Sequence, residues 1–160
     1  MKKLSVVLAV VLGLGLIFPV VGLTQGGRPE YKATGGVTLY LPWVAEFSTF
    51  SFTAQNLGST QGRGQATWID YNSNKWGYDV ELYVNIDYAE YVGTGEMKFG
   101  GSVIGTNNPD FHIGDRIYFW VIDDGSPGIG NDWVNVSWKD LSHFSSDGHS
   151  VLGGNLVVHD

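Results

Sequence analysis

Strict alternation of apolar and polar side chains is the feature that most limits what this chain can fold into. In residues 78–86 every second position is apolar, namely Val80, Leu82, Val84 and Ile86. Successive side chains of a β-strand point to opposite faces, so this run predicts a strand with one buried and one solvated face. Leu82 is then expected in a core, and its neighbour Glu81 in solvent.

Two other runs extend this interpretation. Residues 133–138 repeat the alternation and place Val134, Val136 and Trp138 on one face. Residues 116–122 are almost continuously apolar, which is typical of a strand that is covered on both sides. Both Trp120 and Trp138 therefore occupy core-like positions.

Glycine, asparagine, aspartate and proline separate short runs rich in β-branched and aromatic residues. The expected strands are residues 36–41, 47–55, 64–71, 78–86, 95–104, 116–122, 133–138 and 154–159. The sequence thus predicts an all-β, antiparallel eight-stranded fold, either a sandwich or a small closed barrel. The expected core residues are Phe50, Phe52, Val80, Leu82, Val84, Phe119, Val121, Val134 and Val136.

The N-terminus has the pattern of an export signal. Lys2 and Lys3 precede an apolar run that reaches Leu23, with Pro19 and Gly22 near its end. We interpret residues 1–22 as a signal peptide, residues 23–34 as a linker and residues 35–160 as a single β domain. An uncleaved anchor is the alternative, since the run is about as long as a bilayer requires. Either interpretation predicts a secreted or cell-surface protein with no membrane contact beyond this segment.

Composition narrows the function classes. The chain has no cysteine, which excludes disulfides, thiolate metal sites and a cysteine nucleophile. Its formal net charge of −7 makes nucleic acid an unfavourable partner, because a phosphate backbone would be repelled. No paired histidines and no nucleophile elbow are present. These absences favour a non-enzymatic protein.

Five segments in order resemble a group of small exported bacterial and archaeal β-domains. That group shares a G-G-G start, an F-x-F-x-A strand, a G-x-x-x-Y-x-D strand, a D-x-G-x-P-G-x-x-D-x-F turn and a G-G-N-I-x-I-H tail. The matching segments begin at Gly35, Phe50, Gly64, Asp123 and Gly153. The resemblance implies an exported β-domain and brings no activity, catalytic residue or cofactor with it. The chain departs from the pattern by a two-glycine start and by Trp68, Asn131 and Trp133, which replace Tyr, Asp and Phe.

An acidic turn is a candidate cation site. It contains Asp123, Asp124, Asn131 and Asp132 around a Gly-Ser-Pro-Gly loop. Calcium takes six to eight oxygen ligands, and carboxylates and free carbonyls could supply them. Calcium is accordingly the one cofactor suggested by the sequence. The alternative is that these side chains cap the turn by accepting hydrogen bonds from nearby backbone N–H groups.

Aromatic side chains outside the expected core are candidate ligand contacts. Those that fall in loops or on polar strand faces are Trp43, Trp76, Tyr83 and Trp133. Exposed aromatic rings can stack on sugar rings, and they can equally cover the edges of a sheet.

Two functional hypotheses follow. The first is an exported, non-enzymatic module that binds a polysaccharide or another component of the cell envelope, or has a structural role there. The second is a barrel that binds, or acts as an enzyme on, a small apolar ligand between its strands. A filled interior would favour the first, whereas an interior cavity with converging polar groups would favour the second.

Overall fold

The protein is an all-β closed barrel. The computed structural model describes residues 30–41, 46–125, 131–144 and 148–159, and no helix occurs among them. The structure therefore contains no described helix that could span a membrane. Its strands are β1 (Tyr31–Leu41), β2 (Glu46–Asn56), β3 (Gln61–Asp70), β4 (Val80–Gly93), β5 (Glu96–Thr106), β6 (Arg116–Ile122), β7 (Trp133–Ser137) and β8 (His149–His159).

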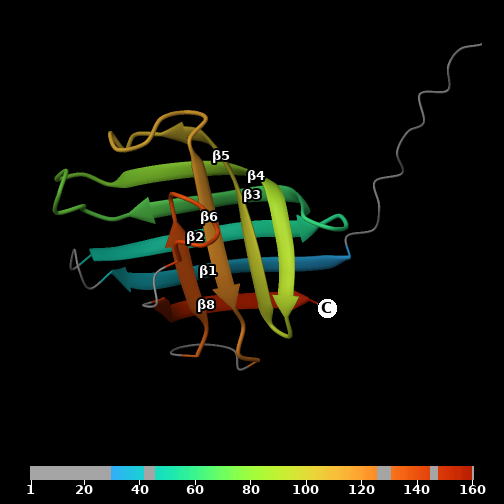
Figure 1. Cartoon of the computed structure of the whole chain (residues 1–160). Coiled ribbons are helices and arrows are strands. Elements are labelled where there is room, and N and C mark those ends of the chain that lie inside the picture. Colours follow the sequence, from blue (N-terminus) through green and yellow to red (C-terminus); the bar gives the residue numbers. More distant parts are fainter. Residues whose placement is uncertain (1–29, 42–45, 126–130, 145–147, 160) are drawn as a thin grey trace, which may run out of the picture.

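Each strand pairs antiparallel with the next, and β8 pairs with β1 to close the barrel (Figure 1). The closing register runs from Lys32 opposite His159 to Leu39 opposite Val151. The weakest seam joins β7 to β8 through two residue pairs, Trp133 with Ser150 and Val134 with His149. The prediction of eight antiparallel strands is confirmed, and of its two forms the closed barrel is correct.

The long strand β4 gives the barrel its shape. Its pairing with β5 shifts register three times, including once between Ile86 and Tyr88. Irregularities of this kind bend a strand and increase its twist. In Figure 1, β4 starts beside β3, bends, and continues downward beside β5, so that β6 runs steeply across β1 and β2.

Phenylalanines fill the middle of the barrel. Phe50, Phe99 and Phe119 have no exposed surface, and Phe52 is almost as buried. The ring centroids of Phe50 and Phe119 lie 4.7 Å apart, and those of Phe52 and Phe99 lie 4.9 Å apart. The predicted core is confirmed: eight of its nine residues are buried, and the ninth, Val136, packs against them.

The end of the barrel beyond the phenylalanines is also filled. Tyr31 and Tyr91 stack there with centroids 4.1 Å apart. The buried Asn56 side chain donates to the carbonyls of Ser59 and Ala89 at 2.8 and 2.6 Å and thereby ties the β2–β3 hairpin to β4.

Two tryptophans differ from the expectation. Trp120 is half-buried and lies opposite Lys98 and Asn135, on the outer face of β6. Its ring meets Phe144 at 5.8 Å, and Lys98 Nζ lies 4.6 Å from its centroid. Trp138 follows the end of β7 and is 61% exposed. The expectation for Trp120 was wrong because the outer face of β6 also carries apolar side chains. The expectation for Trp138 was wrong because β7 ends at Ser137.

Strand ends also differ from the pattern. β1 begins at Tyr31, inside the segment expected to be a linker, and β8 begins at His149 rather than Gly154. Both added stretches are polar or mixed, and they are held by pairing with β2 and β7 rather than by their own alternation.

Candidate functional site

The barrel is open at one end. The strand ends there surround a cavity of about 1120 Å3 that opens to solvent. Figure 1 shows these ends at the left of β1, β2 and β3 and at the top of β6. We call this cavity the mouth. Its size slightly exceeds the usual range for pockets that hold small ligands, about 300–1,000 Å3.

Most of the mouth wall is apolar. The apolar side chains that line it are Leu41, Trp68, Trp76, Val80, Leu82, Phe111, Ile117, Val136 and Trp138. Trp68 connects the mouth to the core, since its ring centroid lies 5.4 Å from that of Phe50.

Two carboxylates, Glu46 and Asp70, stand on the β2 and β3 side of the mouth. We call them the acidic pair. Glu46 is only 5% exposed, and its Oε1 accepts hydrogen bonds from Ser73 Oγ at 3.3 Å and from the Asn74 backbone N–H. Asp70 Oδ1 accepts from Ser48 Oγ and from the Trp68 indole Nε1–H, the latter at 2.5 Å.

Burial is the main cause of a shifted pKa at two groups that line the mouth, Asp70 and His149. Burial raises the pKa of the Asp70 carboxyl above its ordinary value. The hydrogen bonds from Ser48 and Trp68 oppose this rise, and the charge of Glu46 adds to it. Burial lowers the pKa of His149, which favours the neutral imidazole. The other titratable groups that line the mouth are Glu46, Lys75, Asp110, Asp115, Arg116, Lys139 and His143.

Two basic side chains at the outer edge of the mouth, which we call the rim, form ion pairs. Lys75 pairs with Asp110 and also lies over the Trp76 ring, with Nζ 4.6 Å from its centroid. The Arg116 guanidinium contacts both carboxylate oxygens of Asp87, at 2.6 and 2.7 Å. These two basic side chains of the rim are therefore already neutralised.

We expect the substitution Asp70→Asn to stabilise the unliganded protein. Because the pKa of Asp70 is raised on folding, the native state binds more protons than the unfolded state between the two pKa values, and stability falls as pH rises through that window. Asparagine removes the charge and keeps an oxygen to accept from Ser48 and Trp68. Thermal melts should show a higher Tm for the variant at pH 7, and a smaller difference as pH falls toward about 4.

The matched control for that experiment is Asp79→Asn. Asp79 is exposed, and its Oδ1 accepts from the Asn72 N–H at 2.8 Å, a bond that asparagine also keeps. If Asp79→Asn raises the Tm as much as Asp70→Asn does, the gain reflects the overall negative charge and not the mouth.

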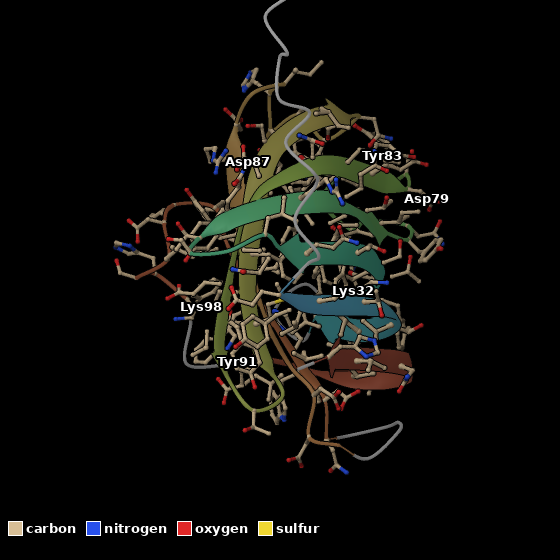
Figure 2. All side chains as sticks on the ribbon, turned by 90° about the vertical axis from the view of Figure 1, so that its right-hand side faces the viewer. Lys32, Asp79, Tyr83, Asp87, Tyr91 and Lys98 are labelled. Atoms are coloured by element: carbon tan, nitrogen blue, oxygen red, sulfur yellow. The ribbon has the colours of Figure 1, made fainter. Side chains whose placement is uncertain are left out.

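The predicted ligand-contacting aromatics do not share one surface. Trp76 lines the mouth, whereas Tyr83 lies on the outer face of β4 and is 39% exposed. Trp133 pairs with Ile122, at the opposite end of β6 and β7 from the mouth. Trp43 lies outside the described residues. In Figure 2, Tyr83 on the first part of β4 and Asp79 just before this strand are well separated from Tyr91 on its second part.

The acidic turn lies at the far end of the barrel. Asp123 Oδ1 accepts from Gly125 N–H at 2.9 Å, and its Oδ2 accepts from Val158 N–H at 3.0 Å. Asp132 is fully buried, and its Oδ1 accepts from Asp124 N–H at 3.4 Å. Burial raises the pKa of Asp132, and the charges of Asp123 and Asp124 raise it further.

In these contacts the carboxylates of Asp123 and Asp132 accept hydrogen bonds from backbone N–H groups, as the turn-capping interpretation of the sequence predicts. The described residues include no cluster of three or more histidine, aspartate or glutamate side chains that could hold a metal ion. Asn131 is exposed at the start of the turn into β7. The calcium site stays a prediction.

Sequence reasoning missed the acidic pair, although the pattern contained it. Glu46, Ser48 and Phe50 alternate with Phe47 and Thr49, so Glu46 shares the inward face of Phe50. In the same way Asp70 shares the inward face of Ala66 and Trp68. A carboxylate on the buried face of a strand is the signal that could have identified both.

Comparisons with known proteins identify no relative. No protein-family model matches the chain, and no curated protein or solved structure matches it.

Proposed function

We propose that this protein binds a small amphipathic molecule in the mouth of its barrel. One observation carries this function: a large open cavity that has an apolar wall, one buried carboxylate (Glu46) and one half-buried carboxylate (Asp70), at one end of a barrel that is otherwise filled. Protein interiors are close-packed, and voids larger than a water molecule are few. A cavity of this size leaves apolar surface unburied, which costs stability unless a ligand covers it.

The outer surface supports a glycan site less well. Stacking on a polysaccharide would need several rings on one face, because each contact contributes on the order of 1 kcal/mol. The three described candidates occupy the mouth, the outside of β4 and the far end of β7. We also propose that binding takes place outside the cytoplasm, as the predicted export signal requires.

A fragment screen tests this function. We expect small aromatic fragments, drawn equally from neutral, cationic and anionic compounds, to give hits by saturation-transfer NMR that compete with one another. Val136→Trp should abolish these hits, because Val136 lines the mouth and an indole there would occupy the cavity. Val136→Ala is the matched control, since it widens the mouth and should keep them.

Thermal melting of both variants shows whether each still folds. The proposed function is wrong if the wild-type protein gives no hits. It is equally wrong if the hits persist in a folded Val136→Trp protein, because the fragments would then bind elsewhere.

A further inference from the structure

Among the described residues, no basic side chain neutralises the acidic pair. Ser48 and Asp70 are register partners on β2 and β3, and Glu46 lies two residues from Ser48 on the same inward face. No lysine, arginine or histidine of the described residues forms an ion pair with either carboxylate. The basic side chains Lys75 and Arg116 of the rim are engaged by Asp110 and Asp87.

Each carboxylate also keeps one oxygen available. The hydrogen bonds to Glu46 all end on Oε1, and those to Asp70 all end on Oδ1. Within the described part of the chain, Glu46 Oε2 and Asp70 Oδ2 accept no hydrogen bond. Glu46 is only 5% exposed, and a carboxylate buried to this extent is normally paired, because an uncompensated buried charge is costly.

We propose that the ligand of the mouth is an amphipathic cation, whose ammonium group lies between Glu46 and Asp70 and whose apolar body packs against Trp68 and Leu82. This inference rests on the proposed function and names the chemistry of its ligand. An ammonium group donates up to three hydrogen bonds and can satisfy both free oxygens at once. The face of an indole such as Trp68 also attracts a nearby cation.

An organic cation fits the mouth better than a metal ion does. Calcium requires six to eight oxygen ligands, and the described residues supply no cluster with that capacity. The remaining wall is mostly apolar, which gives a metal ion nothing to bind and gives a hydrocarbon or aromatic body a surface to cover.

A matched series of three compounds tests the charge preference. The probes are 3-phenylpropylamine, 3-phenylpropan-1-ol and 3-phenylpropanoate, which share one body and differ in the charge of the head group. Titration at pH 7.5 and constant ionic strength should give the amine an affinity about tenfold or more above that of the alcohol, with the acid weakest.

The double variant Glu46→Gln with Asp70→Asn should bring the amine to within about twofold of the alcohol and leave the affinity of the alcohol unchanged. The double variant Asp79→Asn with Glu81→Gln is the control, since it removes the same charge from the outer surface and should keep the preference. A titration with calcium chloride detects a metal site as the competing explanation.

Three outcomes overturn the inference. The alcohol or the acid could bind as tightly as the amine, in which case the mouth binds ligands without selecting a cation and the proposed function survives. The preference could persist in the Glu46→Gln, Asp70→Asn protein. The amine could fail to bind at all, and the fragment screen then decides separately whether the mouth binds anything.

Discussion

Replacing Leu82 with aspartate is expected to unfold the barrel at 25 °C. Leu82 is 5% exposed and belongs to the central core. An unpaired carboxylate at such a position costs several kcal/mol, and the whole stability of a domain is only about 5–15 kcal/mol. Far-UV circular dichroism with urea titration should show loss of the cooperative transition, or a midpoint far below that of the parent.

Glu81→Lys is the control on the same strand. The Glu81 side chain lies on the outer face, where its Oε2 accepts from Tyr83 Oη at 2.6 Å, and that bond is exposed. Its replacement should change stability by about 0.5 kcal/mol or less. Equal urea midpoints for the Leu82 and Glu81 variants would show that Leu82 does not face the core and Glu81 does not face solvent.

Replacing Gly101 with alanine should have an effect of similar size for a different reason. A Cβ atom built at Gly101 would lie 1.9 Å from the carbonyl oxygen of Asn85 and 2.8 Å from the Cα of Ile86. Both are backbone atoms of β4, so β4 and β5 would have to separate where the barrel bends. Overpacking that cannot be relieved by a side-chain rotation should cost about 3 kcal/mol or more, measured by urea denaturation.

Gly36→Ala is the matched control. Gly36 is exposed on β1, and a Cβ there meets no atom within 4 Å. Its stability should stay equal or rise slightly, because alanine lowers the entropy of the unfolded chain. A Gly101→Ala protein as stable as Gly36→Ala would contradict the close approach of β4 and β5.

The strands were predictable because alternation is a local property. Val80 through Ile86 reveal their buried face without reference to any partner, and the phenylalanines of β2 do the same. Closure was not predictable, because it depends on β8 pairing with β1 across almost the whole chain. A sandwich built from the same eight strands would show the same alternation.

The candidate site shows a second limit. The inward direction of Glu46 and Asp70 follows from their strands, but their proximity follows from the register of β2 on β3. The cavity lies where side chains from opposite strands of the barrel do not touch one another. The sequence of a single strand cannot reveal this. Trp76 was identified as a ligand contact from its place in a loop, and the structure puts it at the mouth, whereas Tyr83 and Trp133 lie elsewhere.

The indole N–H of Trp68 gives the most direct test of a ligand site at the mouth. This group donates to Asp70 Oδ1, so its ¹H–¹⁵N NMR cross-peak reports on the acidic pair itself. Trp68→Phe and Trp133→Phe variants assign the two relevant cross-peaks. On titration with 3-phenylpropylamine, we expect the Trp68 cross-peak to move in a saturable way and the Trp133 cross-peak at the far end of the barrel to stay in place. A saturable shift of Trp133 with Trp68 unmoved, or no saturable shift at either, would contradict a ligand site in the mouth.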